Sequence, residues 1–238
     1  MRILITNDDS MSSPALVEFV RWARGLGEVT VVVPKTEQSG KSQALEFTRP
    51  VEIKQVKLAD DVTVYAVDST PTDCVRFATV GLGKQYDLIL SGINRGYNLG
   101  DDICYSGTIG AILEGARLGI KGIAISARED FFTEAVSRLN EVFDYVRERG
   151  LLQRYGWYNV NIPPVSTSIR ITRQGGEYYT DGFRDCGNDM YLQCGDPIER
   201  VFDDNSRDID AVCNGFISIM PLEVLRTNMT VFEELTRE

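Results

Sequence analysis

The sequence predicts an α/β protein with a mostly parallel β-sheet flanked by helices, a β-hairpin excursion and an extended C-terminal segment. Short apolar runs alternate with helical patterns over residues 1–150, which favours strand–helix–strand units with right-handed crossovers. Residues 34–60 interrupt this alternation, and the periodicity weakens after residue 150. We therefore expect one domain over residues 1–238, with its core at 1–150 and C-terminal strands and an oligomerisation segment at 151–238.

The first strand and helix have clear patterns. Residues 2–6 are typical of a buried strand, and a helix is expected to follow, with Ser13 as its N-cap, Pro14 in its first turn and Leu26 at its end. The apolar stripe of this helix consists of Leu16, Phe19, Val20 and Ala23. Residues 29–33 then form a second apolar run, and we expect it to lie parallel to the first strand.

The later elements follow from the same patterns. Residues 34–60 are polar and then weakly alternating, which indicates the β-hairpin excursion. Further strands are expected at residues 62–67, 87–90, 122–126, 158–162, 168–172 and 213–220. Further helices are expected at residues 70–80, 107–118 and 133–149, a long loop at 91–105 and a polar tail at 224–238.

Composition restricts the chemistry. The chain has no histidine, which excludes histidine-based triads and histidine-ligated zinc. Its net charge is −10, from 25 basic and 35 acidic residues, so it is not expected to bind a nucleic acid duplex. The five scattered cysteines favour neither a disulfide framework nor zinc. With no apolar run of about 18 residues and no signal-peptide pattern, we expect a cytoplasmic protein without membrane contact.

Polar residues follow the expected parallel strands at the edge where ligands bind in such sheets. Asp8 and Asp9 follow the first strand, Ser39 follows the second, and Asn94 follows the strand at 87–90. Adjacent carboxylates repel each other unless a cation lies between them, although a solvated turn or a helix cap would also explain the pair. Taken together, these oxygen donors favour Mg²⁺ or Mn²⁺ over zinc or copper.

Two further segments suggest phosphate contacts. Gly40-Lys41-Ser42 resembles the end of a P-loop, but the upstream glycine is missing, which leaves a hydroxyl ligand or a phosphate contact as alternatives. Ser106 can cap the helix that begins with Gly107 and Thr108, and the N–H groups at a helix start suit a phosphate. The preceding loop at 91–105 is rich in glycine and asparagine, a composition that an ordinary surface loop would share.

Several segments together resemble the SurE family of survival-protein phosphatases. They are Ile5-Thr6-Asn7-Asp8-Asp9, Ser39-Gly40, residues 69–75, Ser91-Gly92-Ile93-Asn94 with Gly96, Asn98 and Gly100, Tyr105-Ser106-Gly107-Thr108, residues 208–211 and residues 215–222. The resemblance implies a Rossmann-like core and a homodimer or homotetramer built by exchanged C-terminal segments. It also implies hydrolysis of nucleoside 5′- and 3′-monophosphates, and in similar proteins cleavage of short polyphosphate.

The same resemblance implies a site. One divalent metal per subunit, Mg²⁺ or Mn²⁺, would be held by Asp8, Asp9, Ser39 and Asn94. Substrate contacts would come from Gly40, Asn98, Ser106, Gly107 and Thr108, and the catalytic residues would be Asp8, Asp9 and Asn98. Without histidine the nucleophile is a carboxylate or a water, and we expect a metal-activated water rather than an aspartyl-phosphate.

Departures and rivals remain. Ser10 stands where the family usually has glycine, so it is strained if the position requires a positive φ. Met220 stands where threonine is common. A phosphate-accepting receiver domain would need an aspartate after a central strand, where this chain has Ser91-Gly92. A non-catalytic nucleotide sensor on the same fold is the other alternative.

Overall fold

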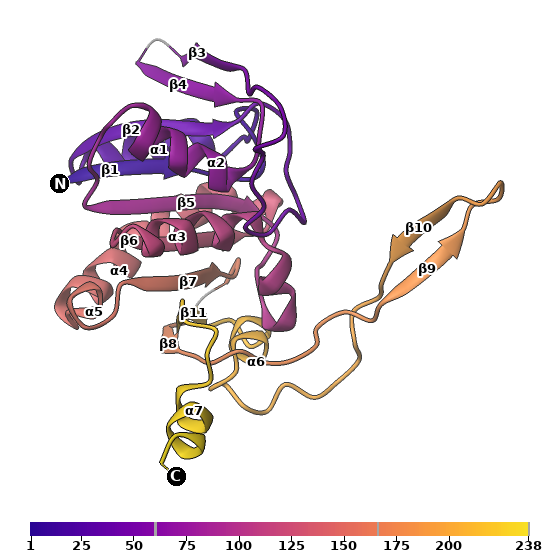
Figure 1. The fold of residues 1–238 in the computed structure, drawn as a ribbon. Coiled ribbons are helices and arrows are strands. Elements are labelled where there is room, and N and C mark those ends of the chain that lie inside the picture. Colours follow the sequence, from indigo (N-terminus) through magenta and orange to yellow (C-terminus); the bar gives the residue numbers. More distant parts are fainter. Residues whose placement is uncertain (60, 166, 238) are drawn as a thin grey trace.

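A nine-stranded sheet forms the centre of the computed structural model, which describes residues 1–59, 61–165 and 167–237 (Figure 1). Its strands are β1 (Arg2–Thr6), β2 (Glu28–Pro34), β3 (Ile53–Ala59), β4 (Val62–Val67), β5 (Leu88–Arg95), β6 (Lys121–Ala127), β7 (Trp157–Ile162), β8 (Ile169–Ile171) and β11 (Ile217–Pro221). Their spatial order is β3-β4-β2-β1-β5-β6-β7-β11-β8.

Most neighbours in this sheet run parallel, which confirms the predicted fold class. Strands β4, β2, β1, β5, β6 and β7 form the parallel part. At one side β3 pairs antiparallel with β4, and at the other β11 pairs antiparallel with β7. The hairpin predicted within residues 34–60 is displaced: only β3 lies in that range, its partner is β4, which was predicted as a separate strand, and residues 35–52 contain no strand. The sheet continues past residue 150 through β7, β11 and β8.

Helices cover both faces of the sheet. They are α1 (Leu16–Arg24), α2 (Pro71–Arg76), α3 (Gly107–Arg117), α4 (Phe132–Glu148), α5 (Leu151–Arg154), α6 (Asp208–Cys213) and α7 (Met229–Leu235), with a π-helix η1 (Phe77–Gly81) and 3₁₀ turns η2 (Gly100–Tyr105) and η3 (Glu129–Phe131). Because strand side chains alternate between faces, Ile3 and Ile5 pack in the core with α1 and α4, whereas Leu4 packs in the core with α2 and α3. No helix in the described ranges is both long and apolar enough to cross a membrane.

The start of α1 differs from the prediction. The helix begins at Leu16, its N-cap is Ala15 with no side-chain cap, and Ser13 and Pro14 lie in the preceding turn. The chain reaches this turn through Ser10, which has a left-handed φ of 74° and thus delays the helix. The helix also ends earlier, at Arg24. Its predicted apolar stripe is confirmed, since all four members are buried.

Strand β5 is longer than predicted. The prediction of a loop at residues 91–105 was wrong for residues 91–95, which belong to this strand. The strand continues through Asn94 to Arg95, because it resumes pairing with β6 after a register shift between Ser91 and Asn94. A short connection then leads into η2. The polar residues at 91–94 are therefore held by a buried strand.

The C-terminal part held further differences. Strands β9 (Gly182–Asp185) and β10 (Tyr191–Cys194) form a hairpin that projects far from the sheet (Figure 1). This hairpin was not predicted because most of its residues are exposed on both faces and show no alternation. The strand predicted from residue 213 was wrong at its start, since Cys213 ends α6. The predicted polar tail contains α7.

Candidate active site at the carboxyl edge of the sheet

The segments that follow β2 and β5 are tied to the two acidic residues that follow β1. The backbone N–H of Gln38 donates to the backbone carbonyl of Asp8 at 2.8 Å. The backbone N–H of Arg95 donates to the Asp9 carboxylate at 2.8 Å. Since β1 lies between β2 and β5, the carboxyl ends of all these strands meet at one edge, as the parallel topology predicts.

Asp8 is buried against the beginning of α3. Only 4% of the residue is exposed, and the Thr108 hydroxyl donates to Asp8 Oδ1 at 2.6 Å. Gly107 lies so close that a Cβ atom on it would be 3.0 Å from Asp8 Cβ. Burial raises the pKa of the Asp8 carboxyl, and the hydrogen bond from Thr108 opposes that rise. The start of α3 and the end of β1 thus form one surface.

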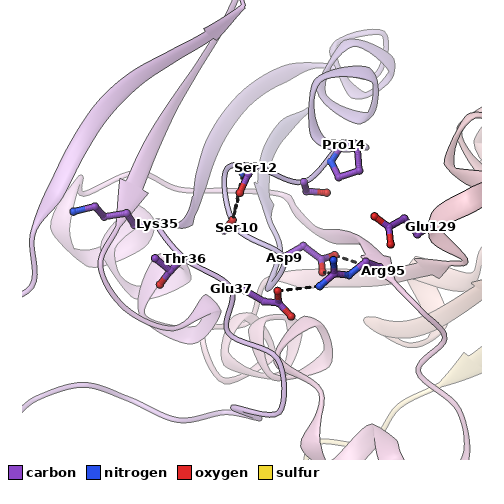
Figure 2. Close-up of a pocket in the computed structure, with 10 residues that line it drawn as sticks. Asp9, Ser10, Ser12, Pro14, Lys35, Thr36, Glu37, Arg95 and Glu129 are labelled. Carbon is purple, nitrogen blue, oxygen red and sulfur yellow. Dashed lines mark hydrogen bonds and ion pairs between the residues drawn. The ribbon is translucent and has the colours of Figure 1, made fainter.

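Asp9 is the second acid at this edge (Figure 2). Burial raises its pKa to about 6, the N–H of Arg95 opposes the rise, and the neighbouring charge of Asp8 adds to it. The Arg95 side chain binds Glu37 at 2.9 Å and also forms a longer ion pair with Asp9 at 3.8 Å. Two adjacent carboxyl groups are therefore largely shielded from water, and the charge of Asp8 makes Asp9 harder to ionise, an arrangement that a bound cation would relieve.

Asn94 and Ser39 complete the predicted donor set. The Asn94 side-chain nitrogen donates to the carbonyl of Gly96 at 2.9 Å, which leaves its Oδ1 oxygen to act as a ligand. Ser39 is exposed, and its hydroxyl donates to Glu37 Oε1 at 2.8 Å. The structure thus brings Asp8, Asp9 and Asn94 to one place, whereas Ser39 lies on the adjoining segment with its hydroxyl turned towards Glu37.

The donor chemistry of this set fits a hard divalent cation. Carboxylate, amide and hydroxyl oxygens are the ligands of Mg²⁺ and Mn²⁺. Within the described residues, no group of at least three His, Cys, Asp or Glu side chains is placed to hold a metal. That finding agrees with a donor set that has carboxylates from two residues alone and draws its other oxygens from an amide and a hydroxyl.

The predicted cap of α3 is confirmed. The Ser106 hydroxyl accepts the backbone N–H of Ile109 at 3.1 Å and leaves its own hydrogen available. Gly107 and Thr108 follow it and are buried. The first N–H groups of a helix have no partner within the helix, so this end carries a partial positive charge beside Asp8.

The loop after β2 lies across the start of α3. The backbone N–H of Ser42 donates to the carbonyl of Tyr105 at 2.9 Å. A Cβ atom on Gly110 would lie 2.2 Å from the Ser42 carbonyl oxygen, so the two backbones approach as closely as glycine allows. Gly40, the predicted substrate contact in this loop, is exposed and has a φ of 72°, a conformation that glycine adopts without strain.

Asn98 is buried at the same edge, and it is held by residues of β6 and β7 that were not among the predicted site residues. Its side-chain nitrogen donates to Ser126 at 2.8 Å, and one hydrogen of that group remains. Its backbone N–H and carbonyl bond to side chains of β7, Asn159 and Asn161. Sequence reasoning missed these residues, although two asparagines two positions apart in an apolar strand were a visible signal.

A cavity of about 390 Å³ opens beside Asp9. Figure 2 shows it between the turn at Ser10 and Ser12, the end of β2 at Lys35, and the Arg95 side chain. Ser10 has a φ of 74°, so the position does require a positive φ, and serine is strained there as expected. Its hydroxyl pairs with that of Ser12 at 2.8 Å. The volume lies in the range of small-molecule pockets.

Known proteins resemble this chain over nearly its whole length. A family model described as survival protein SurE matches residues 3–181. A 5′-nucleotidase SurE from Pseudothermotoga lettingae is 36% identical over 96% of this chain and 91% of its own length. One from Acinetobacter baumannii is 36% identical over 99% and 98%. The crystal structure of the SurE protein from Aquifex aeolicus matches with a TM-score of 0.82 and 35% identity, covering 99% of this chain and 98% of that one.

Proposed function

The chain belongs to the survival protein SurE family, and on that premise we propose that it is a metal-dependent phosphomonoesterase. It hydrolyses nucleoside 5′-monophosphates, and also 3′-monophosphates, to nucleoside and phosphate. The relatives named 5′-nucleotidase SurE support the 5′ activity. The observation that carries the proposal is the pair of adjacent carboxyl groups at the end of β1, of which Asp8 packs against the start of α3 and Asp9 has its pKa raised by burial.

Asp8, Asp9, Ser39 and Asn94 are the proposed ligands of one Mg²⁺ or Mn²⁺ per subunit. When bound, such an ion neutralises charge on the phosphate oxygens and lowers the pKa of a coordinated water. Ser39 reaches the ion by turning its hydroxyl away from Glu37. The contact supporting this set is the hydrogen bond from Arg95 to Asp9, which fixes Asn94, the residue before it, beside the acidic pair.

Proton transfer and phosphate orientation fall to the protein. Water attacks phosphorus, and the bond from phosphorus to the ribose oxygen breaks. A carboxylate, in our proposal that of Asp8, accepts the proton lost by the water, and the departing ribose oxygen takes a proton from solvent and leaves as a hydroxyl. Asn98, Ser106 and the N–H groups at Gly107 and Thr108 hold the phosphoryl group in line, with Gly40 closing the site. The nearly complete burial of Asp8 and its hydrogen bond to Thr108 make it an oriented group rather than a mobile one.

The direct test is release of phosphate from adenosine monophosphate in the presence of Mn²⁺ or Mg²⁺. We expect steady turnover that excess chelator abolishes, and no acid-stable phosphoprotein when the reaction is quenched rapidly. Stoichiometric, hydroxylamine-sensitive phosphoprotein would instead show an aspartyl-phosphate. Tight nucleotide binding without turnover would favour the alternative function, a non-catalytic nucleotide sensor.

Ser106 separates the chemical role of the α3 start from its structural role. Ser106→Ala should lower kcat/KM by roughly tenfold to a thousandfold, about 1.4–4 kcal/mol, because the hydroxyl hydrogen no longer reaches the phosphate. It should also cost about 1 kcal/mol of stability, because the cap on Ile109 is lost. Ser106→Gly is the matched control, since glycine costs only a few tenths of a kcal/mol at a cap. If Ser106→Gly keeps full activity, the hydroxyl has no role in catalysis.

The projecting hairpin and α7 support a homodimer or homotetramer. Tyr179, Phe183 and Tyr191 are exposed, whereas Tyr178 is partly buried against the cluster formed by Leu99, Ile209 and Val212. On α7, Met229, Val231, Phe232 and Leu235 are exposed as well. Apolar side chains on such extended elements are ordered best by a second copy. Light scattering at micromolar concentration should show an oligomer, and a clean monomer would refute this.

A further inference from the structure

Two asparagines lie in the interior of β7 where an apolar core would be expected. Asn159 and Asn161 are both 0% exposed and point to the sheet face opposite Tyr158 and Val160, which pack in the core with α1 and α4. Buried amides are costly unless they are hydrogen-bonded. Within the described residues, the side-chain hydrogen bonds of both asparagines go to Asn98, and Asn159 Oδ1 has no partner.

We propose that Asn161, assisted by Asn159, is a positioning residue that fixes Asn98 for phosphate capture. The inference rests on the proposed function, in which Asn98 contacts the phosphoryl group. Asn161 acts through Asn98 and does not itself touch the substrate.

The contacts form a clamp on the backbone of residue 98. Asn161 Oδ1 accepts the Asn98 N–H at 2.9 Å, and Asn161 Nδ2 donates to the Asn98 carbonyl at 2.9 Å. Asn159 Nδ2 donates to the same carbonyl at 2.8 Å. Both polar groups of this backbone position are thus bound by side chains of β7, at sequence separations of 61 and 63 residues.

The side chain of Asn98 is fixed from the neighbouring strand. Its Nδ2 donates to Ser126 Oγ at 2.8 Å, and Ser126 lies opposite Asn161 in the pairing of β6 with β7. One hydrogen of the Asn98 side-chain amide is therefore bonded to β6, and this bond fixes the direction in which the second hydrogen points. Without the bonds from β7 to the backbone of Asn98, the loop could move. The side chain would move with it, and its second hydrogen would no longer point in a fixed direction.

The rest of the connecting loop depends on similar anchors. The N–H of Gly96 donates to the carbonyl of Ala127, and the N–H of Gly100 donates to the buried carboxylate of Asp208 at 2.9 Å. Residues 96–100 are thus held at both ends and at residue 98. Because the end anchors remain when Asn161 is altered, the loop should shift locally at Asn98 rather than unfold.

Kinetics with adenosine monophosphate and Mn²⁺ test the clamp. Asn161→Ala should lower kcat about 10- to 100-fold, the range expected when a catalytic group moves by up to 1 Å. The effect should appear mainly in kcat, because an oriented amide contributes most in the transition state. Asn159→Ala should have a smaller effect, since the Asn98 carbonyl keeps its bond from Asn161.

Ser218→Ala is the matched control. Ser218 is also 0% exposed and lies opposite Asn161 on the other side of β7, but its hydroxyl pairs with Thr172 at 2.7 Å and not with Asn98. It should lower the melting temperature and leave kcat unchanged. An equal loss of kcat in Ser218→Ala and Asn161→Ala would show that burial of polar groups, not positioning, matters.

A double-mutant comparison decides whether Asn161 acts through Asn98. In an Asn98→Ala background, adding Asn161→Ala should cause little further loss of kcat. Independent, multiplying losses would overturn the inference, and so would unchanged kcat in Asn98→Ala alone. If Asn161→Ala does not fold, the same comparison is made with Asn159→Ala. If the unaltered chain has no activity towards adenosine monophosphate, the proposed function itself is refuted.

Discussion

Replacing Asp8 or Asp9 by asparagine should lower turnover of adenosine monophosphate by about 10³-fold or more, a cost near 4 kcal/mol in transition-state stabilisation. Asparagine keeps the shape of the side chain but removes a negative charge from the proposed metal site. Asp8→Asn also loses the acceptor of the attacking water's proton. The measurement is the initial rate at saturating Mn²⁺, with metal binding followed by titration calorimetry.

Thermal stability supplies a second readout of the same variants. Saturating metal should raise the melting temperature of the unaltered chain, because a ligand that binds the folded state at 100 times its Kd stabilises it by about 2.7 kcal/mol. That increase should be largely lost in either variant. In the absence of metal, neither variant should be less stable, since each removes one of two adjacent acidic groups whose pKa values are raised by burial.

Asp87→Asn is the matched control. Asp87 precedes β5 at the opposite edge of the sheet, where it is exposed and bound to Arg2 at 3.3 Å. This substitution should leave both turnover and the metal-dependent rise in melting temperature intact. Full activity of Asp8→Asn or Asp9→Asn, or of the unaltered chain in excess chelator, would contradict the proposed metal dependence.

Gly110→Ala should lower kcat/KM about 10²-fold, as expected when a catalytic group is displaced by about 1 Å. An alanine Cβ would lie 2.2 Å from the Ser42 carbonyl oxygen and 2.6 Å from its carbonyl carbon. These are backbone atoms, so the loop that carries Ser39 and Gly40 has to move away from α3. Because this loop is largely exposed, the fold should survive. The measurement is the kinetics of purified variants together with their melting temperatures.

Gly115→Ala is the control on the same helix. Its Cβ would lie 2.2 Å from Ile89 Cδ1, a side-chain atom in the core between α3 and the sheet. Overpacking of this kind typically costs about 1–3 kcal/mol, partly offset by about 1 kcal/mol from the higher helix propensity of alanine. Gly115→Ala should therefore reduce stability and leave activity intact. If Gly110→Ala is as active as Gly115→Ala, the position of the loop does not matter for catalysis.

Elements with a strong periodic pattern could be predicted from the sequence. The first strand was predicted at its observed bounds, Arg2–Thr6, and α4 was predicted within one residue at each end. The strand is buried on both faces and the helix on one, so each has a clear pattern of apolar residues in the sequence. Strand β5 could not be bounded in this way, because glycine and asparagine near its end resemble a loop, and only pairing with β6 keeps them in the sheet.

The site divides in a similar way. Asp8 and Asp9 were predictable because they follow a strand directly, and Ser106 because it precedes a helix. Asn159 and Asn161 contact Asn98 across more than 60 residues, a contact that requires knowing the order of β6 and β7 in the sheet. The orientation of Ser39 towards Glu37 likewise depends on local geometry that no pattern in the sequence reveals.

The order of strands in the sheet also has a consequence for synthesis of the chain. Strand β11 comes last of all the described strands in sequence, yet it lies between β7 and β8. Until residues 217–221 have left the ribosome, β8 has no strand to pair with and β7 has an open side. Between the synthesis of β7 and that of β11, a nascent chain thus carries an unpaired strand with free N–H and carbonyl groups, the kind of species that associates wrongly with other chains. Premature termination between β7 and β11 would leave β7, and with it the anchor of Asn98, permanently uncovered on that side.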